Sequence, residues 1–255
     1  MHSDQPEPTS HEASAGSPVD LGHQPLVDVP VSRSWRAGTG AMAVIVALVS
    51  GTVAWGIGEA TYDLFQPSKE AASQPYAFKQ LNAEKNRADG INGSIAFGAL
   101  GGLLGLGLGC VGAWAAQAPR RIPAAAVLGL VLGTVAGAAP CPFLIPLYHQ
   151  HYDPEVPDLK LPLVIHAGIW CSLGAAAGLA FGFGYSDKRK LAAIFLGGFL
   201  GAFAATVLFD VLGAILFPFS EADVPISPSL PARILARLIV AVGVALGVVV
   251  AARRN

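Results

Sequence analysis

Ionisable side chains stand out in this sequence because some of them interrupt, or directly border, long apolar stretches. They are Glu59, Asp63, His166, Asp210, Arg233 and Arg237. A charge inside a bilayer is costly, so such residues are candidates for function. At a rise of about 1.5 Å per helical residue, all of them would lie at a similar depth, near the longer loops. The sequence therefore predicts a polar layer that could bind an ion, a proton or a small solute.

Helix packing alone could also explain these charges. Asp210 lies near the end of the fifth apolar stretch, and Arg237 follows Arg233 by one turn at the start of the sixth. We therefore expect an ion pair between Asp210 and Arg237, which together with side chains reaching the headgroups would be purely structural. His166 differs, because histidine changes its charge near neutral pH. The second and third apolar stretches have no charge near their middles, which disfavours a proton path across the membrane.

A second group of candidate ligands lies between the third and fourth apolar stretches. His149, His151, Asp153 and Glu155 alternate with other residues. In an extended segment, alternate side chains share one face, so these four would converge. Imidazole and carboxylate ligands suit zinc and other divalent transition metals. The alternative is a water-exposed loop whose polar residues only interact with solvent.

Sequence motifs give no support for catalysis. The chain has no nucleophile elbow, phosphate-binding loop, zinc-protease motif or dinucleotide fingerprint, and its glycine-rich stretches lie inside apolar runs. We therefore expect a protein that is not an enzyme and has no cofactor. The formal net charge of −1 provides no basic field for nucleic acid, so no nucleic-acid partner is expected.

The composition places the candidate residues in a membrane. Hydrophobic residues make up 53% of the chain and charged residues 13%, against about 25% charged in typical soluble proteins. Mean hydropathy is +0.54. About 20 apolar residues cross a hydrocarbon layer as a helix. The predicted spans are residues 39–58, 93–116, 122–146, 162–185, 191–217 and 232–252. The expected fold is therefore an all-α bundle of six transmembrane helices over 37–255, preceded by a disordered cytoplasmic tail over 1–36.

Basic residues near the ends of the spans predict the orientation. Nine of them fall on one side: Arg33, Arg36, Arg120, Arg121, Lys188, Arg189, Lys190, Arg253 and Arg254. By the positive-inside rule, this side is cytoplasmic. Both termini are then expected in the cytoplasm. The richness in alanine and glycine indicates a bacterial protein, and hence the inner membrane.

Glycines spaced four residues apart recur in the spans. They are Gly101, Gly105, Gly109, Gly129, Gly133, Gly137, Gly174, Gly178, Gly182, Gly197, Gly201, Gly243 and Gly247. Small residues let transmembrane helices approach closely, so these positions predict tight packing of the helices. The similar spacing in alternate spans also allows three tandem hairpin repeats. We expect a compact structural or accessory subunit in the lipid bilayer, as a homo-oligomer or with membrane-complex subunits. The alternatives are an ion- or solute-transporting protein and an extracytoplasmic metal-binding protein.

Overall fold

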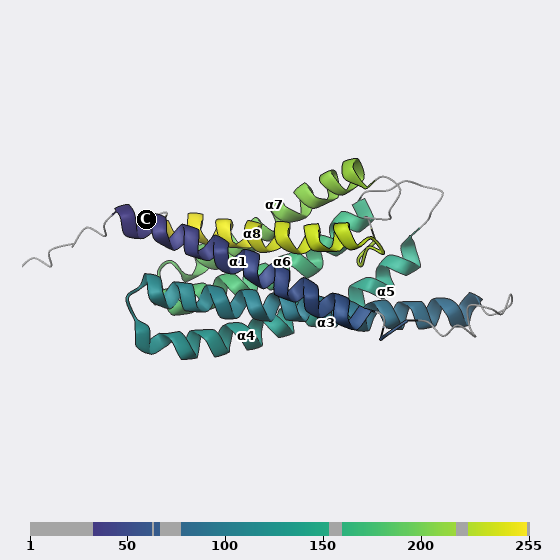
Figure 1. The fold of residues 1–255 in the computed structure, drawn as a ribbon, viewed down its shortest axis with the longest axis horizontal. Helices are drawn as coiled ribbons and strands as arrows, with labels where there is room; N and C mark the ends of the chain where they lie inside the picture. The colour runs from purple at the N-terminus through teal and green to yellow at the C-terminus, as the bar shows by residue number, and fades with distance from the viewer. Residues whose placement is uncertain (1–32, 63, 67–77, 153–159, 218–223, 254–255) are drawn as a thin grey trace, which may run out of the picture. The chain divides into compact units, whose positions relative to one another are not determined.

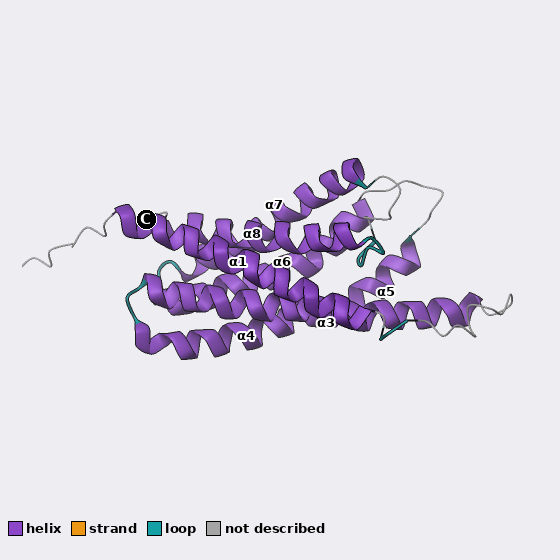
Figure 2. Cartoon of the chain, viewed as in Figure 1, coloured by secondary structure: helices purple, strands orange, loops and turns teal. Residues whose placement is uncertain are grey.

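The computed structural model describes residues 33–62, 64–66, 78–152, 160–217 and 224–253. All regular elements in these ranges are helices (Figures 1 and 2). They are α1 (Arg33–Tyr62), α3 (Phe78–Ala115), the short 3₁₀ helix η1 (Pro119–Arg121), α4 (Ile122–Ala138), α5 (Cys141–His151), α6 (Lys160–Tyr185), α7 (Leu191–Leu216) and α8 (Leu230–Arg253). Most of the predicted tail, residues 1–32, lies outside the described residues.

In the described part of the chain, six segments are long and apolar enough to cross a bilayer. They are Gly38–Tyr62, Leu81–Ala115, Pro119–His151, Lys160–Tyr185, Leu191–Leu216 and Leu230–Arg253. The third combines η1, α4 and α5. The predicted all-α bundle with six spans is confirmed, and the chain is a multi-pass membrane protein.

Helix α3 is much longer than the predicted second span. It runs for 38 residues from Phe78, so the expected span at 93–116 is only its apolar part. Residues 81–88 are rich in leucine, alanine, glutamate, lysine and arginine, which favour helix. Hydropathy identifies the apolar part of α3 but not its polar first turns, so it does not predict where the helix begins.

Prolines divide the third span into α4 and α5. Pro140 has no N–H for the carbonyl of Ala136, and that carbonyl accepts instead from Ser172 Oγ on α6, at 2.7 Å. Likewise Pro142 cannot bond to the carbonyl of Ala138, which lies 3.3 Å from Ser94 Oγ on α3. Neighbouring helices thus satisfy carbonyls that the prolines leave open, as hydrocarbon surroundings require.

Helices α3 and α6 form the centre of the bundle. Helix α3 packs against α1, α4 and α6, while α7 packs against α6 and α8, and α8 packs against α1. The largest buried side chains include Leu104 of α3 and Trp170 and Phe181 of α6. The other helices expose many large apolar side chains outward, as lipid-facing helices do.

Glycines bring neighbouring helices into backbone contact. A Cβ added at Gly133 of α4 would overlap the carbonyl oxygen of Gly101 on α3, and one at Gly129 would overlap that of Gly105. Further backbone contacts include Gly109 with Ala125, Gly112 with Phe181, Gly137 with Phe97, Gly174 with Gly198, Gly178 with Ile194, Gly184 with Gly109, Gly197 with Gly247, and Gly201 with Gly243, whereas Gly182 lies closest to the side chain of Leu191. Any larger residue at the backbone contacts would force the helices apart.

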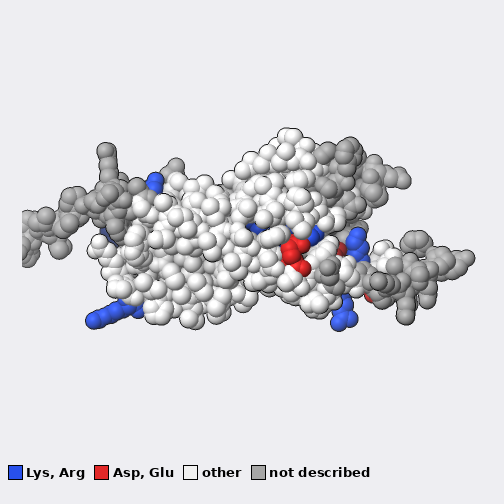
Figure 3. Space-filling model, viewed as in Figure 1, with Lys and Arg blue, Asp and Glu red and all other residues white. Residues whose placement is uncertain are grey.

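The basic turns lie at one end of the bundle. Arg121, the last residue of η1, donates to Ser186 Oγ just after α6. Lys190 Nζ donates to the carbonyl of Ala252 near the end of α8, at 3.2 Å. Arg253 in turn lies against Gly40 near the start of α1. Figure 3 shows lysine and arginine side chains at this end, away from the mixed-charge group on the other half of the bundle.

Candidate functional site

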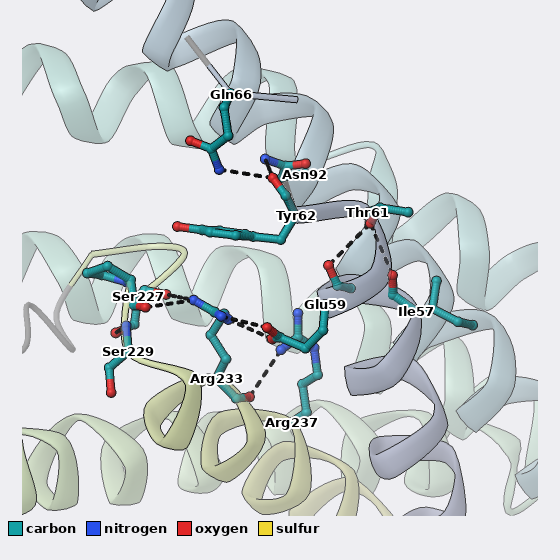
Figure 4. Close-up of polar contacts among 12 residues, drawn as sticks. Ile57, Glu59, Thr61, Tyr62, Gln66, Asn92, Ser227, Ser229, Arg233 and Arg237 are labelled. Atoms are coloured by element: carbon teal, nitrogen blue, oxygen red, sulfur yellow. Dashed lines mark hydrogen bonds and ion pairs between the residues drawn. The ribbon is translucent and has the colours of Figure 1, made fainter. Parts of the chain in front are cut away.

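An ion pair joins α1 to α8 at the far end of the bundle from the basic turns. Arg233 donates from Nε to Glu59 Oε1 at 2.7 Å and from Nη2 to Glu59 Oε2 at 2.6 Å (Figure 4). Two parallel bonds from a planar guanidinium are the strongest form of this interaction. Because only 8% of Arg233 is exposed, solvent weakens the pair little.

Further groups fix the guanidinium of Arg233. Its Nη1 donates to the carbonyls of Ser227 and Pro228, each at 2.9 Å, in the segment that leads into α8. Its Cζ lies 4.3 Å from the ring centroid of Tyr62, a cation–π contact. Arg233 therefore ties the start of α8 to the end of α1.

The end of α1 is capped from α3. Asn92 Nδ2 on α3 donates to the carbonyl of Tyr62 at 3.4 Å and to that of Phe65, just after α1, at 3.0 Å. Gln66 Nε2 also donates to the carbonyl of Tyr62, at 2.9 Å. The last carbonyls of a helix have no partner within the helix. These bonds hold Tyr62 beside Arg233, as Figure 4 shows.

Arg237 is buried with most of its hydrogen-bonding capacity unused. Only 5% of the residue is exposed, and its one hydrogen bond in the described part of the chain runs from Nη1 to the carbonyl of Arg233, at 3.2 Å. The buried Nε has no hydrogen-bond partner there. Glu59 lies close enough to interact electrostatically, but both of its oxygens accept from Arg233. Figure 4 shows Arg237 beside this pair.

A second polar pair joins α6 to α7. His166 Nδ1 lies 2.8 Å from Asp210 Oδ1, and His166 is only 1% exposed. The imidazole stacks on Trp170 at 4.9 Å and meets the edge of Phe209 at 5.8 Å. The other oxygen of Asp210 and the indole Nε1 of Trp170 are buried without a partner among the described residues.

A small cavity lies between the two polar pairs. It has a volume of about 20 Å³ and is lined by Phe97, His166, Trp170, Phe209, Val224, Pro225, Ile226, Ser227, Ala232, Arg233, Ala236 and Arg237. A polar cavity of roughly 10–15 Å³ holds a water molecule. The cavity therefore accepts one water or an ion of similar size, and excludes larger solutes.

The charged residues form different pairs in the structure from those that the sequence predicts. The expected pair of Asp210 with Arg237 is wrong, because Asp210 binds His166 and the guanidinium of Arg237 lies against Gly58 of α1. Asp63 lies outside the described residues. Trp170 was not among the predicted site residues. The sequence points to it only through its position one helical turn after His166.

The candidate metal ligands lie only partly in the described chain. The expected extended conformation is wrong for the two histidines, because both belong to the last turn of α5. His149 Nε2 lies 3.0 Å from Asp89 Oδ2, while His151 Nδ1 lies 3.0 Å from the carbonyl of Leu147. Asp153 and Glu155 lie outside the described residues, and the described part contains no group of three metal-binding side chains. Metal binding stays a prediction.

A large apolar groove lies between α7 and α8. It measures about 810 Å³ and is lined by Ala193, Leu196, Gly197, Leu200, Gly201, Ala204, Ala205, Leu208, Leu238, Ile239, Val242, Gly243, Leu246, Gly247, Val250 and Ala251. Leu200 and Leu246 are each about half exposed, so the groove opens toward lipid.

Comparison of the chain with protein-family models, curated proteins and solved structures finds no significant match.

Proposed function

We propose that this multi-pass membrane protein is a non-enzymatic accessory subunit of a membrane complex. The observation that carries the proposal is the backbone contact between helices at glycine pairs such as Gly101 with Gly133. Such contacts make a rigid bundle, and the cavity between the two polar pairs has room only for a water-sized occupant. This arrangement suits a scaffold better than a solute path.

The α7–α8 groove supports a partner in the membrane. Its lining is apolar from Ala193 to Leu208, a length of roughly 22 Å along α7 at the usual helical rise. A groove of this length matches a helix, and its floor of glycines would let another backbone come close. We assign it to one apolar transmembrane helix of a different subunit, in the inner membrane with both termini of this chain in the cytoplasm.

The proposal can be tested by measuring the mass of the full chain after gentle extraction into native nanodiscs. The expected result is a complex with a second protein at fixed stoichiometry. Ala204→Trp would fill the groove and release the partner. Val131→Trp is the matched control, because Val131 is 54% exposed on α4, away from the groove.

Each outcome decides for or against this role. A monomer in the unaltered protein contradicts it, and a complex of identical copies replaces the foreign subunit with a homo-oligomer. Equal loss of the partner with both tryptophan variants would show that the groove is not the docking site.

A second candidate function is ion-coupled transport, favoured by the convergence of His166, Arg233 and Arg237 on one cavity. Proteoliposomes containing the purified chain would then show a flux of protons or small ions that His166→Phe abolishes. Flux no greater than that of protein-free vesicles excludes this candidate.

A further inference from the structure

We propose that the cavity between α6 and α8 binds one small inorganic anion of the halide class, held by Arg237 and Trp170. This site does not depend on the accessory role, because a bound anion can stabilise the bundle with or without a partner subunit.

The donors around the cavity require an acceptor. A guanidinium has five N–H donors, and Arg237 uses one of them among the described residues. Its Nε and the Nε1 of Trp170 are both buried without a partner, and both residues line the cavity. Both of these atoms are donors only, so a single acceptor between the two helices would satisfy them together.

The charge around the cavity favours an anion over a neutral acceptor. Arg233 and Arg237 both line it, and no described lining residue is a carboxylate. Glu59 already accepts two bonds from Arg233, and Asp210 binds His166 without reaching the lining. The described carboxylate that acts on Arg237, Glu59, is already bound by Arg233, so the buried guanidinium of Arg237 is only partly compensated, and a bound anion would remove the remaining cost.

The size of the cavity limits the anion. About 20 Å³ accommodates one monatomic ion of nearly the size of water. Carboxylates, phosphate and sulfate are too large. The walls formed by Phe97, Phe209 and Ile226 are apolar, so they exclude competing water and strengthen the electrostatic attraction.

The test uses the full chain purified in detergent with gluconate, a bulky anion, as the only counter-ion. Chloride is then added at constant ionic strength while the midpoint of thermal unfolding is measured. A ligand that binds the folded state raises this midpoint with its concentration. Bromide in place of chloride should give an anomalous X-ray peak between α6 and α8.

Trp170→Phe keeps the aromatic contact with His166 and removes the N–H donor. Loss of a hydrogen bond to a charged group should weaken chloride binding roughly tenfold. Trp55→Phe is the matched control, since its indole Nε1 is also buried without a partner among the described residues but does not line the cavity. It should leave chloride binding unchanged. Arg237→Gln should abolish binding.

The outcomes separate an anion from a water molecule. A midpoint that does not respond to chloride, or a structure in bromide without a peak at the cavity, overturns the proposal and assigns the space to water. A chloride response that Trp170→Phe and Trp55→Phe leave equally intact overturns it as well, because the ion then binds elsewhere. If Arg237→Gln fails to fold, the comparison of the two tryptophan variants still decides.

Discussion

Arg233 on α8 binds Glu59 on α1 through both carboxylate oxygens, at 2.7 and 2.6 Å. The two residues are 174 positions apart, so the contact closes the bundle between its first and last described helices. The same guanidinium also donates to the carbonyls of Ser227 and Pro228 and lies over the ring of Tyr62, so these groups shield it from solvent. The contact therefore acts as a structural clamp.

Glu59→Gln should weaken this clamp and destabilise the protein. The amide keeps the shape of the side chain but removes its charge, and the loss of charge-assisted bonds costs about 2 kcal/mol. Thermal unfolding in detergent measures the change. Lys85→Gln is the control, because Lys85 is exposed on α3 and its neutralisation should change stability by less than about 0.5 kcal/mol. Equal losses in the two variants would show that the effect of Glu59→Gln does not come from the contact with Arg233.

Much of the fold follows from composition, because a long apolar segment in lipid has few options other than a helix. The number of spans and most of their ends were therefore predictable. The start of α3 at Phe78 was not, since its polar first part gives no hydropathy signal. Nor was the break after Ala138, because a proline in a membrane helix is tolerated wherever neighbouring side chains satisfy the open carbonyl.

The sequence predicted the depth of the polar residues in the membrane but not which of them form pairs. Counting residues along a helix gives the height of Asp210 or Arg237, because the rise per residue is fixed. The direction in which each side chain points depends on how the helices pack. Asp210 faces α6, and Arg237 faces the contact of α8 with α1. Because α7 and α8 follow each other in the chain, the sequence suggested a pair of Asp210 with Arg237, which the packing of the helices does not allow.

His166 and Asp210 should behave as a coupled pair. In His166→Leu, Asp210 would be left as a carboxylate with no described partner, and removing one member of a buried pair costs about 3 kcal/mol or more. In the double variant His166→Leu with Asp210→Leu, both polar groups are gone, so its loss of stability should be smaller than the sum of the single losses. Chemical unfolding of all four proteins gives this coupling directly. Additive losses would mean that the two residues do not support each other.

Gly133→Ala should separate α3 from α4. The added methyl would overlap the carbonyl of Gly101, and overpacking of this kind costs about 1–3 kcal/mol. Gly56→Ala is the matched control, because a Cβ there meets nothing within 4 Å. We expect the unfolding temperature to fall in Gly133→Ala and to stay unchanged in Gly56→Ala. A tolerated methyl at Gly133 would contradict backbone contact at this crossing.

The end of the bundle that carries Arg121 and Lys190 is expected in the cytoplasm. A fluorescent protein that folds only in the cytoplasm, inserted after Lys190, should therefore be bright. The same reporter inserted after residue 73, between the first two spans in the sequence, should be dark. The reverse pattern would overturn the orientation while leaving the fold intact.

Ser172 should stabilise the protein only because Pro140 leaves a carbonyl open. Ser172 Oγ lies 2.7 Å from the carbonyl of Ala136, which has no N–H at position 140 to bind. Ser172→Ala should cost about 1 kcal/mol in the natural background. In a Pro140→Ala background, the restored N–H can bind that carbonyl, so the same change should cost clearly less. Unfolding of the four proteins tests this, and an equal cost in both backgrounds would show that Ser172 acts through its other contact, the carbonyl of Ile169 at 2.7 Å.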